Sequence, residues 1–103
     1  MKRGEIWWYE HPYLKRRPAL IMTRDEAIGN LGELFTVLAT TQIRGLPTEV
    51  EIGVADGMPS DCVLNADHID AVDKSFLNER ITVLGPEKMG EVCRALALAT
   101  SCG

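Results

Sequence analysis

The stretch from Leu34 to Gln42 constrains the fold of this chain more than any other. Leu34 to Ala39 is too apolar for an exposed edge strand, which predicts a strand in the interior of a sheet. The run then changes abruptly to Thr40, Thr41 and Gln42, three consecutive side chains that can form hydrogen bonds. These polar groups directly follow a rigid strand, so they form a candidate site. Taken alone, the threonines also fit a simple preference for β structure.

A second candidate position is Arg17, the residue before Pro18. The proline fixes its own φ and restricts Arg17 to an extended conformation. Arg17 therefore stands at the start of the apolar strand predicted for residues 18–23, with its guanidinium held by a rigid frame. An isolated arginine is more often a solvated surface cation. The combination of this arginine with the polar run at 40–42 favours a site.

The bulk composition is that of an ordinary folded domain. The chain has 103 residues, of which 46% are hydrophobic and 25% charged, as is typical of globular proteins. This length predicts one domain, residues 1–103, with a single core. No segment approaches the ~20 apolar residues of a membrane helix. Met1–Gly4 leads into a predicted strand instead of a signal sequence, so we expect a cytoplasmic protein without a membrane partner.

The cysteines and histidines predict neither a disulfide framework nor a metal site. The cysteines, at positions 62, 93 and 102, are odd in number and lack Cys-x-x-Cys spacing. His11 and His68 are far apart in sequence and lack the i, i+4 spacing of a metal pair on a helix. We therefore expect no metal and no other cofactor.

Charge is unevenly distributed along the chain. The net charge of −4 argues against non-specific coating of nucleic acid, because such binding requires many cations. The acids concentrate between 56 and 73 and around 87–91, whereas basic residues gather in the first half of the chain. A local basic surface can hold a short anionic segment, although a solvated loop without a ligand explains the charges equally well. The basic residues are Lys15, Arg16, Arg17, Arg24 and Arg44.

Alternation and turn signals predict a β-rich chain with one long helix. The segment 34–42 is expected to form a hairpin with 48–54 across residues 44–47, and 24–33 is expected to be a connection. The side chains of Trp7 and Trp8 should point to opposite faces of the first strand, with at least one in the core. The predicted strands are 4–9, 18–23, 34–42, 48–54, one or two within 61–72, and 80–84.

Helical signals are confined to the last third of the chain. Asp73 is expected to cap one helical turn within 73–78. Pro86 should begin a helix that extends to Ala99, with Met89, Val92, Cys93 and Leu96 on its apolar stripe. The predicted fold class is mostly β (α+β), a small antiparallel barrel with a C-terminal helix.

Taken in this order, five segments of the chain resemble the MazF/PemK family of toxin endoribonucleases. They are MKRGEIWW, the strand opened by Arg17-Pro18, TTQIRGLPTEVEI, DCVLNADHIDAVD and the C-terminal helix. The resemblance implies an SH3-like barrel, also called the CcdB/PemK (MazF) fold, in a homodimer. It also implies metal-independent cleavage of single-stranded RNA at short sequences, which inhibits translation and growth. A cognate, MazE-like antitoxin from the same operon would neutralise the toxin.

The resemblance assigns catalytic roles to two residues. The family's essential arginine falls on Arg17 and its essential threonine on Thr40, with Thr41 as the alternative if the alignment shifts by one. Cleavage of RNA by its own 2′-OH requires acceptance of that proton, stabilisation of charge on the phosphoryl oxygens and assistance to the departing 5′ oxygen. Arg17 can bind two oxygens but is a poor base, so we expect it to stabilise charge or also donate a proton. Thr40 supplies a hydroxyl donor.

Further residues are expected to contact RNA. His68 stands where the family often has Gln, and two readings remain open. It either reaches the cleft, to stack on a base or accept the 2′-OH proton, or is half-buried and bonded to a neighbouring strand. Tyr13 and one of Trp7 or Trp8 are candidate stacking platforms, although core packing is the commoner fate of tryptophan. The predicted RNA-binding set is Lys15, Arg16, Arg24, Thr41, Gln42, Arg44 and His68.

Two other functions remain open at this point. A CcdB-like toxin binds DNA gyrase without cleaving anything and relies on an apolar tail with an exposed Trp, whereas this chain ends in ATSCG. A non-catalytic barrel that binds nucleic acid or protein would need Arg17 but would have little use for Thr40. The loop at 10–16 is shorter than in many relatives of the family, which leaves the recognised bases undetermined.

Overall fold

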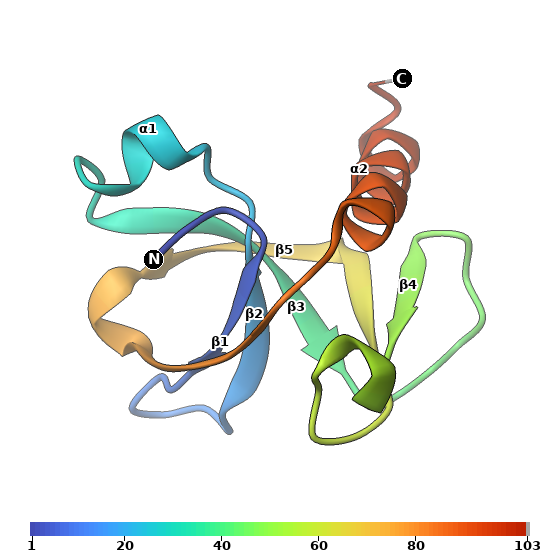
Figure 1. The fold of residues 1–103 in the computed structure, drawn as a ribbon, viewed down its shortest axis with the longest axis horizontal. Coiled ribbons are helices and arrows are strands. Elements are labelled where there is room, and N and C mark those ends of the chain that lie inside the picture. The colour runs from blue at the N-terminus through green and yellow to red at the C-terminus, as the bar shows by residue number, and fades with distance from the viewer. Residues whose placement is uncertain (103) are drawn as a thin grey trace.

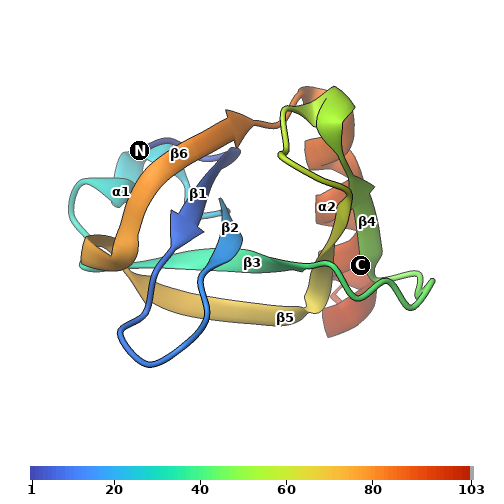
Figure 2. The ribbon, with the colours of Figure 1, turned by 90° about the horizontal axis from the view of Figure 1, so that it is seen from below.

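Antiparallel strands form a curled sheet whose two ends approach each other around a core. The computed structural model describes residues 1–102, and in this part the strand order is β4-β5-β3-β2-β1-β6. Figure 2 shows the sheet wrapping round as the small barrel that the sequence predicts. The strands are β1 (Glu5–Tyr9), β2 (Arg17–Ile21), β3 (Glu33–Thr40), β4 (Glu49–Ile52), β5 (Cys62–Asp73) and β6 (Leu77–Val83).

The predicted hairpin between 34–42 and 48–54 is wrong, because β5 lies between β3 and β4 in the sheet. β4 pairs with the beginning of β5, and β3 pairs with both its beginning and its end. The register with β3 shifts where β5 turns: Val37 pairs with Ile69 but Ala39 pairs with Leu64, so Leu38 is the one β3 residue opposite residues 65–68. This bend in one long strand (Figure 1) lets β5 serve as partner to both neighbours.

Two apolar clusters fill the space on either side of the sheet. Because successive side chains of a strand point to opposite faces, Leu20 belongs to the first cluster and Ile21 to the second. Trp7 packs against the second cluster, whereas Trp8 lies on the other face and lines a cavity. The opposite orientation of the two tryptophans is thus confirmed. Both residues are half-buried, and Trp7 is the one that packs against the core.

Short helical turns lie in the connections between strands. α1 (Asp25–Ile28) is a single turn within the predicted connection, and the short 3₁₀ turns are η1 (Val54–Asp56) and η2 (Lys74–Phe76). Asp73 caps η2 as predicted, because its Oδ1 accepts a 2.8 Å hydrogen bond from the Ser75 N–H. That bond and the Ser75 hydroxyl lower the pKa of the Asp73 carboxyl.

The C-terminal helix α2 (Pro86–Thr100) begins at its proline as predicted and packs on β4 and β5 (Figure 1). Its buried residues are Val92 and Ala95. Cys93 is exposed, so its place in the predicted apolar stripe is wrong; each residue advances ~100° around a helix, which carries Cys93 away from the face of Val92. Within the described part of the chain, no helix combines the length and hydropathy that crossing a bilayer requires.

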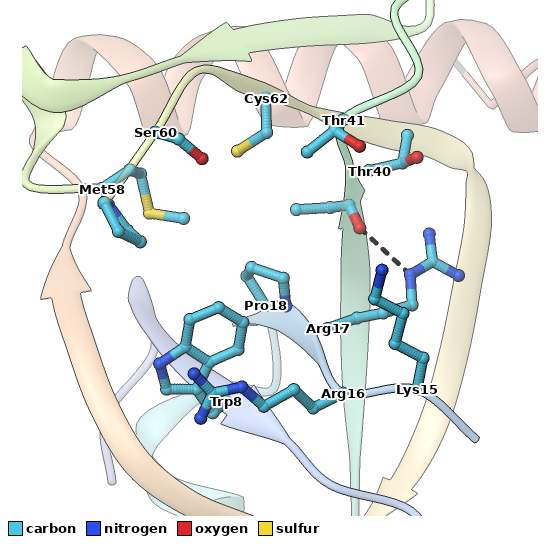
Figure 3. Close-up of a pocket in the computed structure, with 12 residues that line it drawn as sticks. Trp8, Lys15, Arg16, Arg17, Pro18, Thr40, Thr41, Met58, Ser60 and Cys62 are labelled. Atoms are coloured by element: carbon cyan, nitrogen blue, oxygen red, sulfur yellow. Dashed lines mark hydrogen bonds between the residues drawn. The ribbon is translucent and has the colours of Figure 1, made fainter.

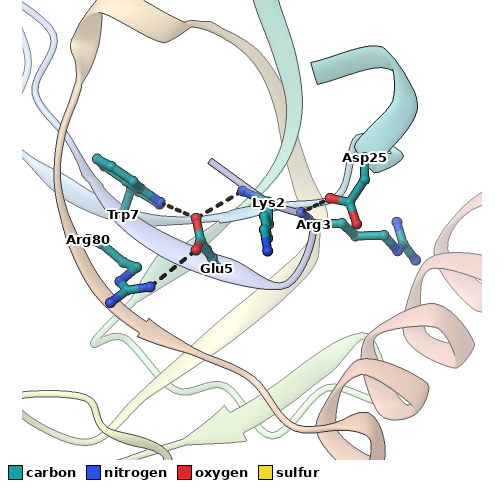
Figure 4. A network of polar contacts seen from close by, with 6 residues as sticks. All are labelled: Lys2, Arg3, Glu5, Trp7, Asp25 and Arg80. Carbon is teal, nitrogen blue, oxygen red and sulfur yellow. Dashed lines mark hydrogen bonds and ion pairs between the residues drawn. The ribbon is translucent and has the colours of Figure 1, made fainter. Parts of the chain in front are cut away.

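A nearly buried carboxylate anchors the first strand. Glu5 is 8% exposed and accepts hydrogen bonds from the Lys2 N–H at 2.9 Å, the Trp7 indole at 3.0 Å and Arg80 Nη1 at 3.3 Å (Figure 4). Burial on its own raises the pKa of Glu5, but the bonds from Trp7, Lys2 and Arg80 together hold it below its ordinary value. Arg80 therefore already has an anionic partner within the fold.

Candidate functional site

The pairing of β2 with β3 brings Arg17 and Thr40 together. The pairs Ala19↔Leu38, Leu20↔Val37 and Ile21↔Thr36 fix an antiparallel register. Continuing this register by two residues places Arg17 opposite Thr40, at the end where β2 begins and β3 stops. The two residues that the sequence singled out on separate grounds thus become neighbours in space.

Arg17 and Thr40 border a cavity of about 360 Å³ (Figure 3). One side comes from β1 and from the loop and strand start around Arg17, the second from the end of β3, and the third from the connection that leads into β5. The lining residues are Trp8, Lys15, Arg16, Arg17, Pro18, Ala39, Thr40, Thr41, Met58, Pro59, Ser60 and Cys62.

The Arg17 guanidinium is held from one side and open on the other. Its Nε donates a 3.1 Å hydrogen bond to the carbonyl oxygen of Ala39 (Figure 3). Among residues 1–102, neither terminal nitrogen has a hydrogen-bond or ion-pair partner. The contact with Ala39 fixes the orientation of the planar fork, and a fork of this kind binds two oxygens of a phosphate or carboxylate at once.

The Thr40 hydroxyl is oriented by a local turn. Its Oγ1 accepts a 3.1 Å hydrogen bond from the Gln42 N–H, which leaves the hydroxyl proton available to a further acceptor. Thr40 is half-buried, whereas Thr41 is exposed but also lines the cavity. The arrangement therefore places a cationic fork and a hydroxyl that can donate a hydrogen bond beside one cavity.

Lys15, Arg16 and Trp8 form the basic and aromatic part of the rim. The Arg16 guanidinium carbon lies 3.9 Å from the centre of the Trp8 ring, a cation–π geometry. Arg16 also pairs with Glu10 at 3.5 Å, and Glu10 in turn accepts a 2.5 Å bond from the Asn78 amide. Lys15 and Arg16, which precede Arg17 and are predicted to contact RNA, thus both border the cavity.

Sequence reasoning missed the wall formed by residues 58–62. The sequence identifies this segment only as a turn followed by a strand. No sequence signal places it across the cavity from Arg17, because its position depends on the path of β5. Burial raises the pKa of the Cys62 thiol, and the carboxylates of Asp61 and Asp56 raise it further. Cys62 therefore stays a neutral thiol at pH 7 and is not an activated nucleophile.

Four residues of the predicted RNA-binding set do not line the cavity. Arg24 follows the far end of β2, so grouping it with the basic cluster on sequence proximity is wrong. Gln42 and Arg44 lie on the exposed segment after β3, where the Arg44 guanidinium donates to the Gln42 side chain at 3.1 Å. His68 is exposed at the bend of β5, which matches neither of the two expected placements.

Tyr13 projects from the loop between β1 and β2. It is 90% exposed, and its ring centre lies 5.8 Å from that of His11. This position leaves Tyr13 available as a stacking platform outside the cavity. Within residues 1–102, no three His, Cys, Asp or Glu side chains gather closely enough to hold a metal ion.

A small antiparallel barrel thus carries an open guanidinium and a hydroxyl at one rim of its sheet. The family model of PemK-like, MazF-like toxins of type II toxin–antitoxin systems matches residues 2–100. The chain is 38% identical to a probable endoribonuclease MazF2 of Mycobacterium tuberculosis, over 99% of this chain and all of the relative. It is 33% identical to the endoribonuclease EndoA of Bacillus subtilis, over 96% and 93%. The chain belongs to this toxin family.

Solved structures agree with this assignment and confirm the predicted fold. The M. tuberculosis toxin MazF-mt6 superposes with a TM-score of 0.86 at 26% identity, covering 94% of this chain and 96% of that one. A mycobacterial endoribonuclease in complex with its cognate antitoxin superposes with a TM-score of 0.88 at 27% identity, covering 100% and 97%.

Proposed function

We propose that this protein is a toxin that cleaves single-stranded RNA and that Arg17 and Thr40 form its active site. The observation that carries the proposal is the meeting of an open guanidinium fork and a free hydroxyl proton at one cavity. Relatives of nearly the same length named as endoribonucleases, at 33–38% identity, support the reaction class.

In the proposed reaction the RNA supplies its own nucleophile. The 2′ oxygen forms a bond to phosphorus while the bond from phosphorus to the 5′ oxygen breaks, which leaves a 2′,3′-cyclic phosphate and a 5′-hydroxyl end. Arg17 binds the non-bridging oxygens and stabilises the charge that grows on them, and Thr40 donates a hydrogen bond to the same group. Water in the open cavity accepts the 2′ proton and returns one to the leaving oxygen. No step requires a metal ion.

The direct test is cleavage of a long single-stranded RNA in the presence of EDTA. We expect discrete fragments with 5′-hydroxyl ends, and their loss in Arg17→Ala. Arg24→Ala is the matched control, because it removes the same charge from the other end of β2 and should leave the fragments unchanged. Intact RNA with the wild-type protein, or fragments that persist in Arg17→Ala, would contradict the proposal.

The partners follow from the same proposal. A structural relative solved in complex with its cognate antitoxin supports an antitoxin partner, and we propose that a MazE-like antitoxin covers the basic rim around Lys15 and Arg16 and competes with RNA. We also propose that the toxin is a homodimer and acts in the cytoplasm, where its RNA substrate is found. Sedimentation of the purified protein gives the oligomeric state, and a mass of about 11.4 kDa in solution would exclude the dimer.

A further inference from the structure

The wall opposite Arg17 and Thr40 has no role in the reaction just described. We propose that the cavity between Trp8 and residues 58–62 receives one nucleobase of the RNA, that of a nucleotide joined to the scissile phosphate, and that Ser60 determines which base is accepted. This inference rests on the proposed function and adds the element that selects the cutting site.

The size of the cavity fits a single base. Its volume of about 360 Å³ lies at the lower end of the roughly 300–1,000 Å³ range of small-molecule sites. It has room for one ring system but not for a stack of bases. When the phosphate of a nucleotide lies on Arg17 at the edge of the cavity, its base can enter the cavity, because only the sugar separates the base from the phosphate.

The walls of the cavity suit the two faces of a base. Trp8 and Pro18 form one side, and Met58 forms another (Figure 3). Met58 is only 4% exposed and belongs to the first apolar cluster, so its side chain is a fixed surface. Proteins read single-stranded RNA by placing unstacked bases against aromatic rings and arginine planes. The Arg16 guanidinium over Trp8 adds such a plane at the entrance.

Ser60 supplies the polar group that a base edge requires. Figure 3 shows its hydroxyl and the Cys62 sulfur directed toward the centre of the cavity. No residue in 1–102 bonds to the Ser60 hydroxyl, which can both donate and accept. Cys62 is buried and contributes only a weak donor and acceptor. The strongest hydrogen-bonding group facing the base from this wall is therefore Ser60.

Cleavage mapping on a randomised RNA tests this role. Ser60→Ala should weaken the preference for the favoured base beside the cut by roughly 3- to 10-fold, the value of one hydrogen bond, without abolishing cleavage. Ser60→Phe should fill the cavity and raise KM more than it lowers kcat. Ser60 is exposed, so both variants should fold. Ala55→Phe, an exposed residue of η1 outside the cavity, is the matched control and should keep wild-type preference.

A binding measurement separates this inference from the cleavage reaction. We expect a ribonucleoside 5′-monophosphate to shift the NMR signal of the Trp8 indole N–H in the wild type and in Ala55→Phe, but not in Ser60→Phe. The nucleobase site is overturned if both Ser60 variants cleave RNA with unchanged base preference. It is also overturned if none of the four ribonucleoside 5′-monophosphates shifts the Trp8 signal of the wild type. Failure of the wild type to cleave RNA contradicts the proposed function instead, and the titration still reports on the cavity.

Discussion

Two arginines of this toxin stand in opposite situations. Arg80 pairs with Glu5, a carboxylate that also receives the Trp7 indole and a backbone N–H, so its charge is balanced within the fold (Figure 4). Arg17 uses only its Nε, on the carbonyl of Ala39, and within residues 1–102 its terminal nitrogens meet no partner (Figure 3). One arginine has an anionic partner within the fold, and the other is oriented by a carbonyl oxygen but has none in the described part of the chain.

The difference distinguishes structural from functional polar groups. A buried carboxylate such as Glu5 must be hydrogen-bonded, because an unpaired buried charge is costly. A half-exposed guanidinium can stay hydrated and exchange its waters for phosphate oxygens when RNA binds. Substitutions around Glu5 should therefore change stability, whereas substitutions around Arg17 should change activity.

The largest expected effect is on catalysis at Thr40. Thr40→Ala should lower kcat about 10²- to 10³-fold, the usual cost of one donor to a charged transition state, with little change in the free energy of unfolding. Thr40→Ser keeps the hydroxyl and should retain most of the activity. Single-turnover cleavage of an RNA oligonucleotide measures both variants. If Thr40→Ser and Thr40→Ala lose the same amount of activity, the hydroxyl is not the reason for the slower cleavage.

The next effect is on stability at Glu5. Glu5→Ala leaves the Trp7 indole and the Lys2 N–H without their acceptor and should destabilise the fold by about 1–3 kcal/mol. Glu5→Gln keeps one oxygen acceptor and should cost less. Urea titration followed by tryptophan fluorescence gives both values, and cleavage per folded molecule should stay at the wild-type level. A large loss of specific activity with unchanged stability would reverse the comparison.

The pH dependence of stability should follow the carboxylate of Glu5. Its pKa in the fold lies below the ordinary value of 4.5, so the stabilisation is fully present above that value. It is lost as the pH falls from 4.5 through the lowered pKa, because protonation is then easier in the unfolded chain. Glu5→Gln should flatten this acid limb in thermal unfolding. Asp73→Asn tests the other carboxyl whose pKa is lowered, and in both variants the stability lost relative to the wild type should be largest at pH 7 and shrink as the pH falls through the lowered pKa.

The smallest effect should come from Arg17 on stability. Arg17→Ala removes one hydrogen bond from a partly solvated group and should change the free energy of unfolding by no more than about 0.5 kcal/mol, as for most surface substitutions. The same urea titration provides the measurement. A loss as large as that of Glu5→Ala would mean that Arg17 is a structural residue, and the contrast between the two arginines would fail.

Much of the fold could be predicted from the sequence because the signals are local. Pro86 marks the start of α2 and Asp73 the cap of η2, since each acts within one turn of chain. The sequence did not show that β2 pairs with β3. It did indicate both candidate positions, because Pro18 restricts Arg17 and the apolar run ends at Thr40.

The errors arise where distant segments meet. The hairpin prediction fails because β3 and β4, although consecutive in sequence, do not pair; β5 bends at 65–68 and takes the place between them. Arg24 lies near Arg17 in sequence, but the length of β2 separates the two. His68 lies on the bend itself, where the register shift decides its exposure.

The sequence by itself determined which segments extend or coil and which side chains stand at strand ends, because conformational restriction by proline, hydrophobic alternation and capping act between near neighbours. Only the tertiary structure decided that β5 passes between β3 and β4 and that Met58 and Ser60 face Arg17 across one cavity. The reason is that strand partners are chosen by burying apolar faces over the whole barrel, an interaction between residues far apart along the chain.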